Sequence, residues 1–149
     1  MDIKIENGNI VHSGADTIIV NLFEGVTAPG GATGAVDIAL GGVISDLIAG
    51  GDFKGKTGEV AVLYPHGAIA ARRVLVAGLG KADSFSLEGV RRASAAAIKR
   101  ARDLNAQHVA TIVHGAGIGG LDVRAAAQAT VEGALLSTYR FDAPKKREP

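Results

Sequence analysis

Thr17-Ile18-Ile19-Val20-Asn21-Leu22 is the segment of the sequence that decides the fold class. It is almost wholly apolar and rich in β-branched residues, which is typical of a strand covered on both faces. Apolar residues then recur at helical spacing, at Val36, Leu40, Val43 and Leu47. We expect one helix across that stretch, ended by Gly50-Gly51, because glycine disfavours a continuing helix. A buried strand followed by an amphipathic helix predicts an α/β fold.

Two more short strands are predicted at residues 60–64 and 74–77. Pro65 and Gly67 lie in the brief stretch between them, and both residues favour turns, so the pair is expected to form an antiparallel hairpin. At the N-terminus, Ile3 and Ile5 alternate with charged residues, the pattern of a half-exposed edge strand.

The second half of the chain returns to alternating helices and strands. Ser86 is a plausible N-cap for a helix with an apolar face, residues 109–113 resemble another buried strand, and Asp122 could cap an alanine-rich helix running to about Tyr139. The predicted order is β-β-α-β-β-α-β-α. A hairpin within such alternation implies an α/β three-layer sandwich, in which a mixed sheet is flanked by helices. Residues 143–149 are polar and proline-flanked, as in a linker that leaves a domain.

Composition excludes several classes of protein. The 149 residues suit one domain, and 16 basic against 15 acidic residues give a formal charge of +1, too weak a field to favour nucleic acid or anionic lipid. The absence of cysteine excludes disulfides and cysteine-bound zinc. The sequence has no signal-peptide pattern and no stretch of about 18 apolar residues, so no membrane span is expected. We predict a cytoplasmic domain.

Residues 50–57, Gly-Gly-Asp-Phe-Lys-Gly-Lys-Thr, match the phosphate-loop pattern GxxxxGK[ST]. A phosphate loop follows a strand and opens a helix, whose N-terminal amides then point at the anion. Here the predicted helix comes before the loop and the predicted strand after it. We therefore interpret residues 50–57 as a turn.

Residues 115–120, Gly-Ala-Gly-Ile-Gly-Gly, match the dinucleotide pattern GxGxxG and lie between a predicted strand and a predicted helix. Two features disfavour a dinucleotide. No second strand follows to supply the ribose-binding acid expected about 20 residues later. In addition, Asp122 would place negative charge beside the phosphates. Whether this loop, or the loop at Gly30-Gly31, binds any ligand stays open.

The remaining candidates for chemistry are the histidines at positions 12, 66, 108 and 114. None has a second histidine or a carboxylate at metal-ligand spacing such as HExxH, and the carboxylates are scattered along the chain. We therefore assign no catalytic, cofactor-binding or metal-binding residue and expect no catalysis by this chain alone.

Three segments carry a resemblance to a known family. They are residues 73–81, Arg-Val-Leu-Val-Ala-Gly-Leu-Gly-Lys; residues 51–59, Gly-Asp-Phe-Lys-Gly-Lys-Thr-Gly-Glu; and residues 131–142, Val-Glu-Gly-Ala-Leu-Leu-Ser-Thr-Tyr-Arg-Phe-Asp. In their order along the chain, 51–59, 73–81 and 131–142, they resemble the N-terminal domain of the leucyl aminopeptidases, which is macro-domain-like in fold. The family usually continues with a Tyr-Lys pair where this chain has Ala143-Pro144-Lys145, so the geometry at the exit of the last helix stays open.

The resemblance implies a cytosolic two-domain metallo-exopeptidase that releases N-terminal residues from peptides with two divalent metals, zinc or manganese. The family's metal ligands lie in its C-terminal domain, in an Asn-Thr-Asp-Ala-Glu-Gly-Arg segment that does not occur here. Residues 1–142 would then be a non-catalytic N-terminal domain, and residues 143–149 the start of the linker. The implied partners are the C-terminal catalytic domain and further copies in a hexamer. The implied role is structural, oligomeric or regulatory.

An alternative is an ADP-ribose-binding macro-type module. Residues 16–21, Asp-Thr-Ile-Ile-Val-Asn, resemble the macro strand that ends in asparagine, and residues 30–37, Gly-Gly-Ala-Thr-Gly-Ala-Val-Asp, resemble its glycine-rich loop. The loop at residues 115–119 would lie where the macro phosphate loop does. Two glycine-rich loops at helix N-termini could hold a diphosphate. However, the second asparagine of the macro signature is missing, and Glu24 would place negative charge near the ligand.

Overall fold

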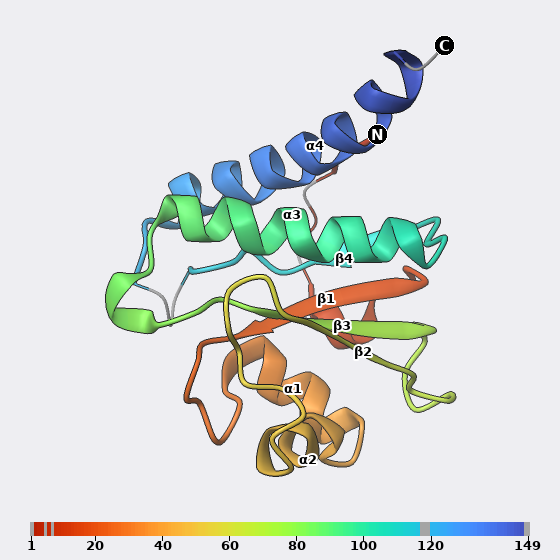
Figure 1. Ribbon diagram of the computed structural model, residues 1–149. Helices are drawn as coiled ribbons and strands as arrows, with labels where there is room; N and C mark the ends of the chain where they lie inside the picture. Colours follow the sequence, from red (N-terminus) through yellow and green to blue (C-terminus); the bar gives the residue numbers. More distant parts are fainter. Residues whose placement is uncertain (1, 5, 7, 117–119, 148–149) are drawn as a thin grey trace.

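The computed structural model describes residues 2–4, 6, 8–116 and 120–147, with the backbone alone described from 138 onward. At its centre is a four-stranded sheet in the order β2-β3-β1-β4 (Figure 1). β1 (Thr17–Leu22) pairs in parallel with β3 (Arg73–Gly78) and with β4 (Val109–Thr111). β2 (Val60–Leu63) pairs antiparallel with β3, which confirms the predicted hairpin.

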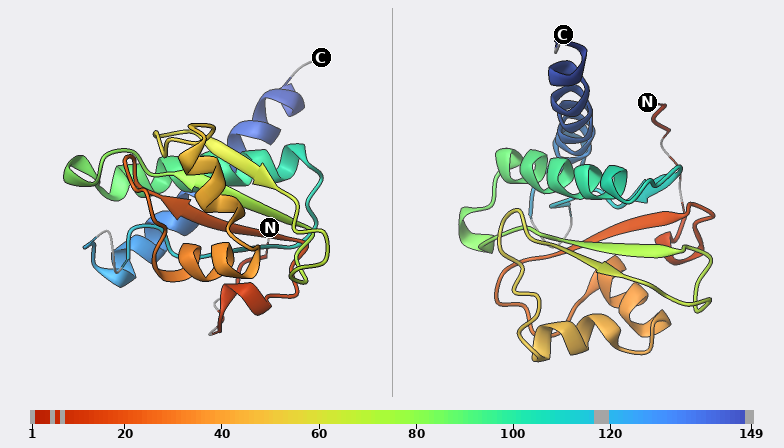
Figure 2. Two further views of the ribbon diagram at one scale, coloured as in Figure 1. Left: turned by 90° about the horizontal axis from the view of Figure 1, so that it is seen from below. Right: turned by 45° about the vertical axis from the view of Figure 1, so that its right-hand side comes forward.

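Helices cover both faces of the sheet (Figures 1 and 2). α1 (Gly31–Ala39) and α2 (Val43–Ala49) lie on one face. α3 (Leu87–Asp103) lies on the other face, and α4 (Val123–Arg147) packs along α3. Two short 3-10 helices, η1 (Ile10–His12) and η2 (Ala82–Ser84), complete the elements. The predicted α/β sandwich with a mixed sheet is confirmed.

The side chains of β1 alternate between two apolar cores, as the period of a strand requires. Ile18 and Val20 are fully buried in the core beneath α1 and α2. Ile19 is fully buried on the opposite face, with Ala97 and Ala101 of α3. Both faces of β1 are covered, which is why its sequence is a continuous apolar run.

The prediction of a single helix between residues 36 and 50 was wrong. The segment forms α1 and α2, whose axes are bent by 107°. Gly41 (φ 74°) and Gly42 (φ 91°) lie between them in the left-handed region that favours glycine. The apolar spacing continues across this break because both helices direct side chains at the same sheet face, with Val36 and Ile44 fully buried there.

Element boundaries differ from the prediction in three other places. Ile3 lies outside any strand and is 44% exposed, while Ile5 lies outside the described residues. β4 ends at Thr111, two residues earlier than expected. α4 continues through the predicted linker to Arg147.

The two predicted caps are confirmed. The Ser86 hydroxyl accepts a hydrogen bond from the Gly89 amide at 3.4 Å, and the Asp122 carboxylate accepts one from the Ala125 amide at 3.0 Å. Within the described ranges no single helix is long and apolar enough to cross a membrane. The α1–α2 pair meets that test only when its two bent parts are taken together.

Candidate functional site

The carboxyl ends of β1 and β3 form the place where this topology favours a ligand site. The two strands are parallel neighbours. The chain leaves β1 toward α1 on one face of the sheet and leaves β3 toward α3 on the other (Figure 1). In open α/β sheets such a switch in direction creates a crevice outside the carboxyl ends of the strands, where ligands commonly bind.

Backbone hydrogen bonds close part of this crevice. The Leu79 amide donates to Leu22 O at 2.9 Å, and the Glu24 amide donates to Gly80 O at 2.8 Å. The Gly80 amide in turn donates to Gly55 O at 2.8 Å, which holds the loop after α2 over the ends of both strands. Because the first two bonds bridge the ends of β1 and β3 directly, the space that remains lies on the α1–α2 side of the sheet.

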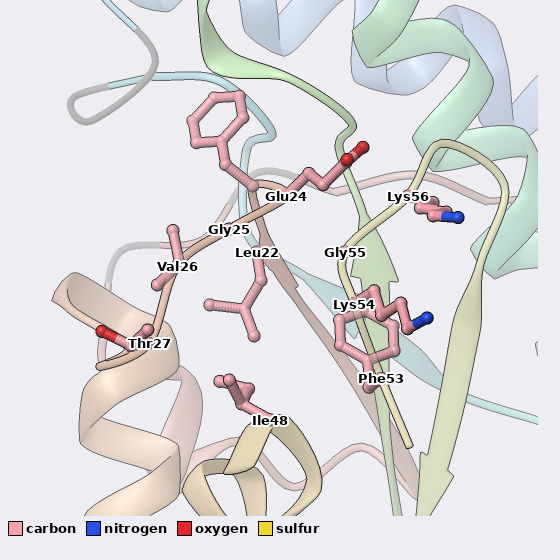
Figure 3. A pocket seen from close by; sticks show the side chains of 11 residues that line it. Leu22, Glu24, Gly25, Val26, Thr27, Ile48, Phe53, Lys54, Gly55 and Lys56 are labelled. Carbon is pink, nitrogen blue, oxygen red and sulfur yellow. The ribbon is translucent and has the colours of Figure 1, made fainter. Parts of the chain in front are cut away.

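That space is a hollow of about 300 Å³. We call it the strand-end hollow. Figure 3 shows Leu22, Ile48 and Phe53 around it, from β1, α2 and the following loop. Its lining is completed by Phe23, Glu24, Gly25, Val26, Thr27, Lys54, Gly55 and Lys56. The hollow therefore combines an apolar base with three charged side chains.

Residues 50–57 follow α2 and precede β2, so their interpretation as a turn is confirmed. The Lys54 and Lys56 amides each donate to Glu59 Oε1 at 3.1 Å. Amides that would face a phosphate in a phosphate loop are thus engaged by a carboxylate of the chain itself. We find no phosphate-binding geometry in this loop.

The glycine-rich loop at 115–120 lies between β4 and α4, in the predicted context. Residues 117–119 fall outside the described residues. Across the neck of the loop, the Leu121 amide donates to Gly115 O at 3.3 Å. Gly115 has φ 85°, and a Cβ there would lie 2.6 Å from Phe85 Cε2, so only glycine fits this position.

The glycine-rich loop at 30–34 leads into α1. Gly30 is the extended N-cap residue of the helix. A Cβ on Gly34 would lie 2.7 Å from Pro29 O, which explains the glycine at that position by close packing of the chain against itself.

Of the four histidines, all of which the structure describes, His114 alone is completely buried. Its Nδ1 lies 2.8 Å from Asn21 Nδ2, its Nε2 lies 3.4 Å from Thr111 Oγ1, and its amide donates to Thr130 Oγ1 at 3.3 Å. Burial lowers the pKa of His114 from its ordinary 6.5 to about 4. From the sequence, nothing distinguished His114 from the other three histidines; its place directly after the strand predicted at residues 109–113 was the available signal.

The other histidines take no part in this cluster. His12 ends η1, His66 lies in the turn after β2 with φ 51°, and His108 is exposed, its amide donating to Asp16. Among the described residues, no group of three or more His, Asp or Glu side chains is placed to hold a metal ion. The strand-end hollow and the His114 cluster are separate, and neither was predicted as a site.

A second surface feature lies where α4 packs on α3. Arg91 Nε donates to Glu132 Oε1 at 2.9 Å, and this hydrogen bond, followed by one from Gln128, lowers the pKa of Glu132. Next to this pair, Leu135 and Leu136 are each 45% exposed and line an open hollow of about 450 Å³. We call the four residues that line this hollow, Arg91, Glu132, Leu135 and Leu136, the outer α4 surface.

The sequence matches the family model "Cytosol aminopeptidase family, N-terminal domain" over residues 19–148. The probable cytosol aminopeptidase of Alkaliphilus oremlandii is 32% identical over 142 residues, which are 95% of this chain and 28% of that protein. The chain thus spans less than a third of the length of this relative.

Two solved structures share the fold. A mutant of tomato leucine aminopeptidase has a TM-score of 0.70 at 21% identity, covering 89% of this chain and 27% of that one. The macrodomain of Mycobacterium tuberculosis DarG has a TM-score of 0.72 at 18% identity, covering 88% of both chains. At these identities the two structures establish the macro-domain-like fold and nothing further. The chain belongs to the cytosol aminopeptidase family, and it is the family's N-terminal domain that it matches.

Proposed function

We propose that this chain is the non-catalytic N-terminal domain of a leucyl aminopeptidase that acts in the cytoplasm, with a structural or regulatory role toward a catalytic domain. The observation that carries the proposal is the coverage of the match: 95% of this chain aligns with only 28% of the Alkaliphilus oremlandii relative. Because the matched part is the family's N-terminal domain, the rest of the relative's length follows the segment that corresponds to α4.

The metal chemistry of the proposed parent would belong to that remaining length. Two divalent ions, zinc or manganese, would activate water and stabilise the tetrahedral oxyanion there. The described residues of this chain do not fit such a site, because they bring no three potential ligands together. No step of the hydrolysis is therefore assigned to a residue of this chain.

The outer α4 surface is the proposed contact with the remainder of the parent. Leu135 and Leu136 are adjacent, half-exposed leucines on the last helix, which is the element nearest in sequence to the following domain. Burying both against a partner would remove apolar surface from water, which is the main favourable contribution in most protein contacts. The same surface could instead join subunits of the proposed hexamer.

The hydrolysis of leucine amide substrates tests this proposal. The purified 149-residue chain, supplied with Mn²⁺ or Zn²⁺, is expected to show no turnover above the rate with buffer and metal alone. Metal-dependent turnover that copurifies with the chain and disappears with a chelator would overturn the non-catalytic role.

The alternative of an ADP-ribose-binding macro-type module rests on the shared fold and the two glycine-rich loops. Two observations disfavour it: the crevice between β1 and β3 is bridged by the Leu79–Leu22 and Glu24–Gly80 bonds, and Glu24 lines what remains. We expect no heat of binding when millimolar ADP-ribose is titrated into the chain. Micromolar affinity would favour the macro-type alternative instead.

A further inference from the structure

β2 is an edge strand, and its outer side is open. The strand order places it at one end of the sheet with β3 on its inner side, and no described segment pairs with its outer side (Figure 1). The Gly78 amide donates to Glu59 O at 2.8 Å, in register with the ladder of β2 and β3. Because bonded and non-bonded residues alternate along an antiparallel ladder, the backbone groups of Val60 and Val62 point away from β3. Within the described ranges, no hydrogen bond outside the sheet engages them.

The sequence of β2 lacks the features by which exposed edge strands avoid pairing. Such strands are usually interrupted by a charge, a proline or a bulge, or are very short. Residues 60–63, Val-Ala-Val-Leu, contain no charge and no proline, and they pair with β3 in an unbroken register. β4, the other edge strand, has three residues, and the Asp16 carboxylate accepts from the Gln107 and His108 amides just before it. β2 is therefore the edge that is better suited to receive another strand.

The side chains of β2 are also incompletely covered. Val60, Ala61 and Val62 pack against the two apolar cores but remain half-buried. Tyr64, directly after the strand, is 51% exposed. A strand added at this edge would cover apolar side chains on both faces of the sheet and would bond the outward backbone groups.

The segment is complementary to a second copy of itself. With a two-fold axis at Ala61, Val60 of one copy lies opposite Val62 of the other, and both residues have outward backbone groups that can exchange hydrogen bonds. Pairs of β-branched residues that face each other across two strands are stabilising. Ala61 then lies opposite itself at a non-bonded position, where Cα atoms approach to about 4.5 Å and a small side chain fits. A shift by one residue would instead set outward groups opposite inward ones.

The residues that flank the strand fit the same register. Tyr64 of one copy would lie opposite Gly58 of the other. The space beside Gly58 is open, since a Cβ there would have no neighbour within 4 Å. An aromatic ring placed over a glycine of an adjacent strand covers backbone that is otherwise exposed. The most exposed apolar side chain at this edge thus meets an unfilled position.

We propose that β2 pairs antiparallel with β2 of a second copy, across a two-fold axis at Ala61, and joins the two sheets into one. The pairing of so short a strand buries less than the roughly 1,200–2,000 Å² of stable interfaces, so the dimer is weak and forms at high concentration. This inference goes beyond the proposed function and does not rest on it.

Sedimentation equilibrium and amide hydrogen exchange of the purified 149-residue chain test the proposal. Between about 10 μM and about 1 mM, the average mass is expected to rise from 15.1 kDa toward twice that value. Over the same range, exchange at the Val60 and Val62 amides should slow by at least about three-fold, because these amides become bonded. A mass that stays at one chain, or exchange at both valines that is independent of concentration, would overturn the proposal.

A charge exchange at the axis tests the register. A61K and A61E each set like charges face to face, and each is expected to weaken association by at least about five-fold. An equal mixture of the two variants should associate again, because opposite charges then face each other. A68K adds the same charge in the exposed turn after β2 and is the matched control, and thermal unfolding shows that each variant is folded. A mixture that associates no better than either variant alone would contradict the register.

L135Q with L136Q separates this contact from the outer α4 surface. The double variant should associate as the natural chain does, and loss of association in it, with A61K unaffected, would overturn the proposal. Because these experiments measure association of the chain with itself, their failure would leave the proposed function intact. Turnover by the chain would overturn the proposed function without bearing on the pairing of β2.

Discussion

Asn21 Nδ2 lies 2.8 Å from Nδ1 of the buried His114, a contact that joins the end of β1 to the start of the glycine-rich loop after β4. The Thr111 hydroxyl donates to Ile112 O at 2.9 Å, so its oxygen can only accept from His114 Nε2. Nε2 of His114 therefore carries the proton, and Nδ1 accepts from the Asn21 amide group. The imidazole is held neutral, in one tautomer, by neighbours on both sides.

Stability is expected to fall between about pH 6.5 and pH 4 because of His114. Its pKa is about 4 in the folded chain and near 6.5 once unfolded, so the unfolded state binds the extra proton first. The contribution is fully present above pH 6.5 and is lost as the pH falls toward 4, by up to about 3 kcal/mol. Urea unfolding at a series of pH values measures it.

H114Q is the comparison for this prediction, since it keeps a polar side chain but does not titrate. Its free energy of unfolding should vary much less across the same interval, whatever its absolute stability. Parallel pH profiles for H114Q and the natural chain would show that the dependence has another source. The lowered pKa of Asp16 acts at still lower pH and does not confuse the comparison.

Asp37 should stabilise the corner between α1 and α2. Its buried carboxylate accepts from the Ile44 amide at 2.8 Å and the Ser45 amide at 3.1 Å, so it caps the start of α2. D37A leaves both amides without this partner and is expected to cost about 2 kcal/mol in thermal or urea unfolding. D46N, at an exposed carboxylate in the same helix, should change stability by less than about 0.5 kcal/mol. Equal effects of the two substitutions would exclude the capping role.

Gly78 marks the close approach between β3 and the loop that covers the strand ends. A Cβ there would meet Lys56 O and would lie 2.7 Å from the Gly55 carbonyl carbon. G78A should therefore destabilise the chain by about 2 kcal/mol through overpacking, and should alter the amide shifts of residues 53–57. G14A, where nothing lies within 4 Å of the new methyl group, is the control. Unchanged shifts in the loop would contradict the close packing.

The outer α4 surface should matter for the proposed contact with a catalytic domain and not for the stability of the chain alone. L135Q with L136Q is expected to change the unfolding of the 149-residue chain by less than about 1 kcal/mol, because both leucines are already half-exposed. In the proposed longer protein the same two substitutions should accelerate proteolysis between this domain and the proposed catalytic domain. I38Q, at an 82% exposed residue on α1, should have no effect in either protein. An unaltered rate of proteolysis in the proposed longer protein would show that this surface is not the contact between the domains.

Much of the fold was predictable because single segments carry their own signals. The apolar run at residues 17–22 requires cover on both faces, and Ser86 and Asp122 are caps that act within one turn of their helices. The break between α1 and α2 was missed because apolar spacing continued across Gly41-Gly42. The glycine pair was itself the available signal, since both residues take left-handed φ values at the break.

The candidate site was not predictable in the same way, because its parts come from distant segments. Glu24 follows β1, whereas Lys54 and Lys56 follow α2, and they line one hollow because Gly80 binds both loops. Asn21 and His114 are 93 positions apart and are joined by the pairing of β1 with β4. No local spacing in the sequence records contacts of this kind.

Titration of Mn²⁺ and of Zn²⁺ into the purified, metal-free chain tests the central claim most directly, because the claim is that the family's metal chemistry lies outside this domain. The account predicts only weak, non-stoichiometric heats in calorimetry for both ions. Stoichiometric binding of one or two ions, tight enough to raise the melting temperature and abolished by substituting specific acids or histidines of this chain, would contradict it.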